Sequence, residues 1–167
     1  MKLIAAKFFL SLAWCWAFGQ GKAAVSAAEA ACGLRTSRPR DFSMTAVESR
    51  HPTQIPDSGK ALIYVVQNAP GGTRVGADGK WLGASKRGTY FSASVDPGEH
   101  HLCARAHIGL WNHLSFHELK AKAGETYYFV ARVVGAVSYD QFDISQVDPD
   151  QGKYFVAQAK FSESRPK

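Results

Sequence analysis

The run Lys60-Ala61-Leu62-Ile63-Tyr64-Val65-Val66-Gln67 decides the fold of this chain. It is apolar and rich in β-branched residues, and it lies between Ser58-Gly59 and the turn-forming stretch 68–72. A short apolar run with such boundaries is typical of a strand that is buried on both faces. We therefore expect other elements to cover the strand on both sides.

The segments after this run alternate between apolar and polar residues, and turn signals separate them. Residues 73–77 and 80–84 flank Asp78-Gly79, a pair that favours a two-residue type I′ hairpin because both turn positions need positive φ. Further strands are expected at 88–95, which should be half-buried, and at 100–108, 114–121, 126–134 and 142–147. About seven short antiparallel strands predict an all-β sandwich or a small barrel.

The pattern changes at Asp148-Pro149. An aspartate followed by proline is a typical helix start, because the carboxylate caps the free N–H groups and proline suits the first helical position. We expect Tyr154, Phe155 and Ala159 to face the sheet. Gly152 weakens the prediction of a helix, and a strand over 154–157 is the alternative.

The N-terminus resembles a secretory signal peptide over residues 1–27. Two lysines precede the apolar run 8–18, and small residues follow it. Val25-Ser26-Ala27 predicts cleavage before Ala28, and Ala17-Phe18-Gly19 is a second choice. An uncleaved anchor is the other interpretation, but the run is shorter than the roughly 20 apolar residues of a spanning helix.

The rest of the chain divides into three parts. Residues 28–58 contain three prolines and scattered apolar residues, so they predict an extended N-terminal arm. Residues 59–163 form the expected β-sandwich domain, and 164–167 a short tail. No segment after the signal is long and apolar enough to cross a bilayer.

Removal of residues 1–27 changes the charge of the protein. It takes away three of the 20 basic residues and none of the 14 acidic ones, so the formal charge falls from +6 to +3. Such a charge on about 140 residues is no electrostatic footprint for nucleic acid. The expected location is the periplasm or the extracellular space.

Cleavage would leave two of the three cysteines, Cys32 and Cys103. A pair of cysteines in an oxidising compartment is most simply explained by one disulfide. The alternative is lipidation of Cys32, which needs an apolar residue three positions earlier. Glu29 stands there, so the disulfide is favoured over the lipid anchor.

Histidines are concentrated between residues 100 and 117. Side chains alternate along a strand, so His101 and His107 share a face, and His117 of the next strand could complete a zinc or copper site. The competing interpretation is a solvent-facing polar sheet surface, because the ligand spacing matches no known signature. The sequence indicates no other cofactor.

Two tryptophans are candidates for surface binding. Trp81 lies beside the predicted hairpin turn, and Trp111 lies in the loop after residue 108. Exposed indole rings could stack on sugars or peptides, whereas the alternative is packing across strands at the edge of the core.

Catalytic motifs are absent from the sequence. It contains no Gly-x-Ser-x-Gly, no His-Glu-x-x-His and no phosphate-binding glycine loop,. The four aspartates between 140 and 150 lack the central glycine and terminal glutamate of an EF-hand. We expect the protein not to be an enzyme.

The chain resembles the bacterial family labelled domain of unknown function 2846. The resemblance covers roughly residues 57–160 and is carried by the segments 59–65, 75–83, 95–103, 123–129 and 148–153, together with Tyr90-Phe91. Exported relatives also have a Cys-Gly near the mature start, which matches Cys32-Gly33 and supports the Cys32–Cys103 bridge. The resemblance implies an immunoglobulin-like or transthyretin-like sandwich, and it implies no activity and no functional residues.

Three functions follow as hypotheses. The first is a non-catalytic module of the cell envelope or secretome that binds a protein or glycan surface. The second is a small metal-binding protein that uses the histidine face. The third, more remote, is an exported hydrolase.

Overall fold

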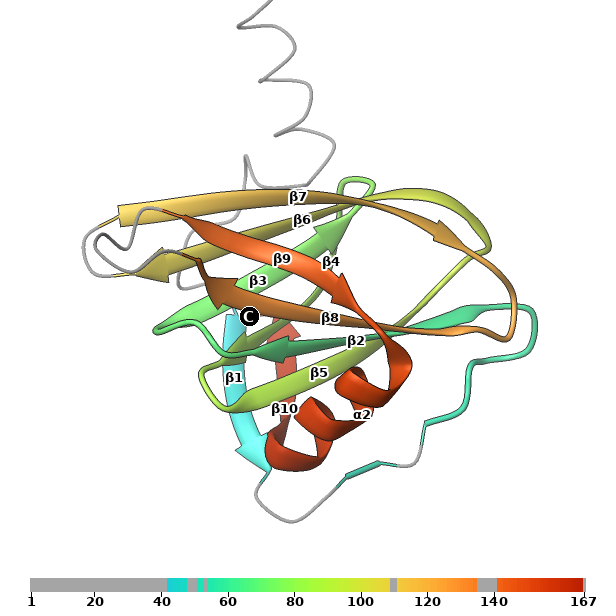
Figure 1. Ribbon diagram of the computed structural model, residues 1–167, viewed down its shortest axis with the longest axis horizontal. Coiled ribbons are helices and arrows are strands. Elements are labelled where there is room, and N and C mark those ends of the chain that lie inside the picture. The colour runs from blue at the N-terminus through green and yellow to red at the C-terminus, as the bar shows by residue number, and fades with distance from the viewer. Residues whose placement is uncertain (1–41, 48–50, 53, 109–110, 135–140, 167) are drawn as a thin grey trace, which may run out of the picture.

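Strand β2 (Ala61–Gln67) lies inside the larger of two β-sheets in the computed structural model, which describes residues 42–47, 51–52, 54–108, 111–134 and 141–166. Sheet A has the strand order β1-β10-β5-β2-β8-β9, and sheet B has the order β4-β3-β6-β7 (Figure 1). The remaining strands of sheet A are β1 (Phe42–Val47), β5 (Thr89–Val95), β8 (Thr126–Val133), β9 (Phe142–Val147) and β10 (Lys160–Pro166). Those of sheet B are β3 (Gly72–Ala77), β4 (Lys80–Lys86), β6 (Gly98–Ile108) and β7 (Trp111–Ala121). The predicted all-β sandwich is confirmed.

Both faces of β2 are buried, as the apolar run predicts. Ile63 and Val65 point into the core between the sheets, whereas Leu62, Tyr64 and Val66 belong to a second apolar cluster on the other face of sheet A. The inter-sheet core includes Val75 and Leu102 of sheet B. A strand with apolar residues at consecutive positions is stable only where both faces are covered, because side chains alternate between the faces.

The second cluster is covered by helix α2 (Pro149–Gln158), which follows β9 and packs on sheet A (Figure 1). Asp148 caps it, since its side chain accepts hydrogen bonds from the backbone N–H groups of Asp150 and Gln151. The predicted helix start is therefore confirmed. Phe155 and Ala159 pack on the sheet as expected.

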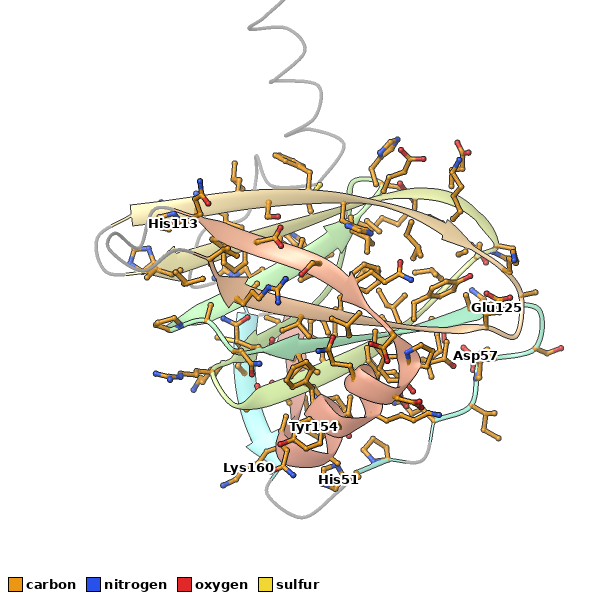
Figure 2. All side chains as sticks on the ribbon, in the orientation of Figure 1. His51, Asp57, His113, Glu125, Tyr154 and Lys160 are labelled. Carbon is orange, nitrogen blue, oxygen red and sulfur yellow. The ribbon has the colours of Figure 1, made fainter. Side chains whose placement is uncertain are left out.

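Two expectations about this helix need correction. Tyr154 is 62% exposed on the outside of α2, and Val156 packs on the cluster in its place (Figure 2). Gly152 lies within α2 and does not break it. A Cβ at this position would collide with the ring of Tyr128. The glycine lets the helix approach the sheet closely.

The hairpin between β3 and β4 forms as predicted. Asp78 and Gly79 have φ values of 49° and 81°, which are the two positive values that a type I′ turn requires. The strand predicted at 88–95 is more buried than expected. Tyr90, on the side turned away from the inter-sheet core, is 1% exposed because it lies in the cluster with α2.

The expected boundaries of the sandwich are too narrow. Strand β1 lies inside the predicted arm, and it pairs with β10, which extends into the predicted tail. The two sheets are mostly antiparallel, as expected, and sheet A also contains two parallel pairs, β10 with β5 and β2 with β8. Within the described residues, no helix is long and apolar enough to cross a membrane.

Serine hydroxyls join the two sheets along both of their edges. At one edge, Ser162 of β10 donates to the carbonyl oxygen of Ala84, and Ser164 accepts from the Ala84 N–H at 3.1 Å. At the other edge, Ser115 of β7 accepts from Ile144 N–H at 3.0 Å and donates to Asp143. These contacts satisfy backbone groups of edge strands that would otherwise lack a partner.

Candidate functional site

The three histidines of the predicted metal site do not come together. His101 and His107 are exposed on the outer face of sheet B, but six residues of strand separate them by about 20 Å. His117 lies opposite Leu102 in the register and therefore points inward, where its ring contacts Phe129 edge-on at 5.1 Å. No group of three or more His, Cys, Asp or Glu side chains among the described residues is placed to hold a metal ion.

Trp81 is half-buried and packs against Cys103, which is 0% exposed on the outer face of sheet B. The packing interpretation therefore describes Trp81 better than an exposed binding ring does. Trp111 begins β7, but its side chain lies outside the described part of the structure, as does all of Cys32. The Cys32–Cys103 disulfide and the alternative lipid anchor stay predictions.

A cavity of about 250 Å³ opens on the outer face of sheet B. Arg74 of β3 and Arg105 of β6 stand directly opposite one another in the register and line it. The other lining residues are Met44, Gly71, Gly72, His107 and Asn112. We call it the arginine pocket. Sequence reasoning missed it because the pairing of β3 with β6 is a non-local feature.

Strand β7 reverses the usual distribution of side chains along part of its length. His113, Ser115 and His117 alternate onto the inner face, opposite Ala106, Ala104 and Leu102 of β6. Leu114 and Phe116 consequently point outward, where they are 39% and 51% exposed. We call these two side chains the β7 patch. In the register they lie opposite Arg105 and Cys103, so the patch adjoins the arginine pocket.

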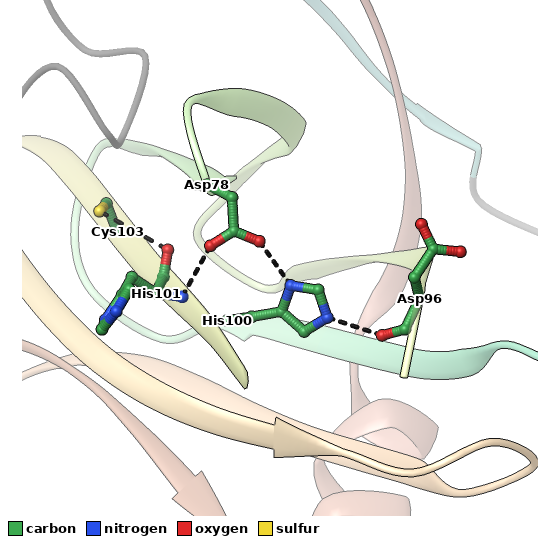
Figure 3. Close-up of polar contacts among 5 residues, drawn as sticks. All are labelled: Asp78, Asp96, His100, His101 and Cys103. Atoms are coloured by element: carbon green, nitrogen blue, oxygen red, sulfur yellow. Dashed lines mark hydrogen bonds and ion pairs between the residues drawn. The ribbon is translucent and has the colours of Figure 1, made fainter. Parts of the chain in front are cut away.

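A second polar arrangement joins two turns at one end of the sandwich (Figure 3). His100 Nδ1 lies 2.5 Å from Asp78 Oδ2, in the β3–β4 turn, and His100 Nε2 lies 2.6 Å from the carbonyl oxygen of Asp96, after β5. The other carboxylate oxygen of Asp78 accepts from the His101 backbone N–H at 3.0 Å. Lys60 pairs with the carboxylate of Asp96 at 3.3 Å.

The chemistry of these contacts sets the charge of His100. A carboxylate and a carbonyl are both acceptors, so these contacts favour the protonated ring, in which both nitrogens donate. Partial burial alone would lower the pKa of His100, but the hydrogen bonds to Asp78 and Asp96 outweigh it and the pKa is raised. Burial likewise would raise the pKa of Asp78, but the hydrogen bonds from His100 and His101 lower it. Because the ring contacts Asp78 on one side and Asp96 on the other, it joins the β3–β4 turn to the turn after β5.

On the face of sheet A that α2 covers, three tyrosines gather under the helix. The rings of Tyr64 and Tyr128 stack at 5.2 Å, and Tyr90 lies 5.9 Å from Tyr64. Burial raises the pKa of all three hydroxyls, and the neighbouring tyrosine adds to the increase at Tyr64 and Tyr90. These rings are therefore neutral packing groups at physiological pH.

Comparison with known proteins does not assign the chain to a family. No known protein family matches the chain, and no curated protein matches it. The likeness to domain of unknown function 2846 stays a resemblance, and the functional conclusion depends on the geometry of sheet B.

Proposed function

We propose that this chain is an exported, non-catalytic β-sandwich module that binds a partner protein through the outer face of sheet B. The observation that carries the proposal is the reversal in β7. Leu114 and Phe116 face solvent while Ser115 and His117 of the same strand face inward. Local rules that fail in an otherwise regular fold tend to fail at functional sites.

The composition of this surface supports a protein partner. Aromatic residues and arginine are enriched at protein interfaces, and both carry a large share of binding energy there. Phe116 supplies an exposed ring, and the half-buried Arg105 lies on the neighbouring strand, opposite Leu114. A partner that covered the β7 patch would remove apolar surface from water, which is the main favourable term in association.

Comparing a change in the β7 patch with a change at the exposed ring of Tyr154, on the other face of the sandwich, tests this function. The double variant Leu114→Ser, Phe116→Ser and the control Tyr154→Ser, on α2, are compared with the unchanged protein in cross-linking to envelope proteins. We expect one partner, identified by mass spectrometry, to bind the purified unchanged protein and the control, and to lose at least tenfold in affinity for the double variant.

Equal binding by the double variant would overturn the proposal. A glycan array provides the contrasting outcome: a glycan that binds the unchanged protein and not the double variant would replace the protein partner by a carbohydrate at the same surface. The metal-binding alternative has a separate test, since purified protein without stoichiometric zinc or copper would exclude it.

Export is the second part of the proposal, and it rests on the N-terminal sequence,. Intact mass spectrometry of the exported protein checks it. We expect cleavage before Ala28 and a mass two daltons below the reduced value, which the Cys32–Cys103 disulfide would cause. A mass that includes residues 1–27, or a lipid on Cys32, would contradict this part without affecting the surface on sheet B.

A further inference from the structure

His100 lies at one end of the inter-sheet core. Side chains alternate along a strand, so His100 is on the same side of β6 as Leu102 and Ala104, which belong to that core. Its side chain is 13% exposed and lies between the β3–β4 turn of sheet B and the turn after β5 of sheet A (Figure 3). A change in the charge of this ring therefore acts on both sheets at once.

The ring contacts one acceptor on each sheet. Nδ1 lies 2.5 Å from Oδ2 of Asp78, and Nε2 lies 2.6 Å from the carbonyl oxygen of Asp96. An ionised carboxylate and a carbonyl only accept, so each contact is a hydrogen bond only while the ring nitrogen that faces it carries a proton. The protonated ring makes both hydrogen bonds, whereas the neutral ring has a single N–H and makes only one.

The two hydrogen bonds differ in strength. A hydrogen bond to an ionised group is roughly twice as strong as one between neutral groups. The carboxylate of Asp78 is also fixed by the His101 backbone N–H, which donates to Oδ1 at 3.0 Å. A neutral ring therefore keeps its proton on Nδ1, towards Asp78, and loses the hydrogen bond to the carbonyl of Asp96.

We propose that His100 is a proton-operated clasp between the two sheets. The protonated ring holds the turn at Asp96 to sheet B, and the neutral ring releases that turn while it stays bonded to Asp78. Release loosens the end of the core at which Ala61 and Val95 are buried. The clasp does not involve the β7 patch, so it goes beyond the proposed function and stands or falls separately.

The groups that face the ring set the pH of release. Partial burial alone would lower the pKa of His100, but the hydrogen bonds and the charges of Asp78 and Asp96 raise it above 6.5. Lys60 pairs with the carboxylate of Asp96 at 3.3 Å. Other charged or titratable side chains at this end of the molecule lie on the outer face of sheet B or in turns, and they are Lys80, Glu99, His101, Glu118, Lys120, Lys122 and Glu125. Release therefore belongs to a pH above 6.5.

Nitrogen-15 NMR of the imidazole ring in the purified mature protein reports the state of the clasp. Long-range proton–nitrogen spectra distinguish the charged ring from each of its two neutral tautomers. We expect a charged ring at about pH 5.5. With a midpoint above 6.5, it should become a neutral ring that carries its proton on Nδ1.

Backbone order parameters of the same sample measure the release. Those of Asp96 and Gly98 should fall from about 0.85 at about pH 5.5 to below about 0.6 at about pH 8.5, which are the values of rigid and of flexible backbone. Those of Asp78 and Gly79 should stay at about 0.85 at both pH values, because the neutral ring still donates to Asp78.

Two matched variants locate the cause. Asp78→Asn removes the carboxylate that contacts the ring, and asparagine tolerates the positive φ of this position,. Asp96→Asn leaves the contacting carbonyl in place and removes only a nearby charge. We expect Asp78→Asn to lower the titration midpoint of His100 by about one pH unit or more, an approximately tenfold loss of proton affinity, and Asp96→Asn to lower it by less.

His100→Gln should remove the pH dependence of the order parameters at Asp96 and Gly98. If that variant does not fold, Asp78→Asn keeps the test valid, because release should move to lower pH together with the midpoint. A neutral ring with its proton on Nε2, order parameters that do not change with pH, or equal shifts of the midpoint in the two aspartate variants would each overturn the clasp.

Discussion

The two outer faces of this sandwich are built from similar strands and have opposite fates. On sheet A, Leu62, Tyr64 and Val66 lie beneath α2 in an apolar cluster. On sheet B, the corresponding face carries exposed histidines and the β7 patch. The face of sheet A is a second apolar core, whereas the face of sheet B exposes polar and apolar side chains to solvent.

The difference is already encoded in the strands. Strand β2 is apolar at consecutive positions, which requires a cover on both faces, whereas β6 alternates Leu102 and Ala104 with His101 and Arg105. Alternation therefore reports how many faces of a strand are covered. Strand β7 departs from this rule, which is why it singles out the surface of sheet B.

The same kind of truncation on the two faces gives the largest contrast. Tyr90→Ala removes a ring that is 1% exposed and that contacts Tyr64, Phe161 and His51. We expect a loss of about 3–5 kcal/mol in the free energy of unfolding, as for large aromatic residues in protein cores. Phe116→Ala should change it by no more than about 0.5 kcal/mol.

Chemical denaturation with linear extrapolation measures both values. Equal losses for the two variants would break the comparison, because they would show that the β7 patch belongs to the stabilising core. A small loss for Tyr90→Ala would show that α2 does not seal its face of sheet A.

A methyl group at Gly152 is the next largest change. It would push α2 away from Tyr128, and we expect Gly152→Ala to cost about 1–3 kcal/mol as an overpacking substitution, even though alanine is the better helix former. Lys153→Ala, one position along on the exposed side, serves as the control and should stay within about 0.5 kcal/mol. A stabilising Gly152→Ala would mean that α2 packs more loosely than the structure shows.

Features that depend on neighbouring residues were predictable from the sequence. The apolar run of β2, the Asp78-Gly79 turn and the Asp148-Pro149 helix start each act within a few residues. The position of Tyr154 was mistaken because the helix rotation is set by packing on sheet A, which favours Val156.

Features that depend on pairing between distant strands were not predictable. Strand β1 mixes apolar residues with serine and threonine, and β10 mixes apolar with charged residues. Both acquire their role only by pairing with one another. The histidine site failed for the same reason, since the register of β7 turns His117 inward. The arginine pocket exists because β3 and β6 bring Arg74 and Arg105 together across 31 positions of sequence.

The hydroxyl of Ser115 tests how strongly the two sheets are held together at the β7–β9 edge. It accepts from the Ile144 N–H and donates to Asp143, and so it joins β7 to β9. Ser115→Ala leaves a buried N–H without its acceptor, and we expect a loss of about 1–3 kcal/mol. Ser94→Ala, whose hydroxyl donates to Asp57 at the surface, should cost no more than about 0.5 kcal/mol. Equal effects of the two variants would show that the β7–β9 edge contributes no more than a surface contact.

The pH dependence of stability gives the smallest effect. It reports on the His100–Asp78 contact at the β3–β4 turn, which belongs to neither outer face. The pKa of His100 is raised above 6.5 in the folded state, so its stabilising contribution is complete below pH 6.5 and is lost as the pH rises through the folded value. The pKa of Asp78 is lowered below 3.8, so its contribution is present above that pH and is lost as the pH falls through the folded value.

The contributions of Asp78 and His100 therefore coincide between about pH 4 and 6.5. Melting curves of the unchanged protein should show a higher Tm at about pH 5.5 than at about pH 8, and His100→Gln should reduce that difference. His101→Gln is the matched control. His101 acts on Asp78 through its backbone N–H and through the charge of its ring, but its ring makes no hydrogen bond to Asp78, so this variant should reduce the difference less. If His101→Gln reduced the difference as much as His100→Gln, the charge on the ring that joins the two turns would not be its cause.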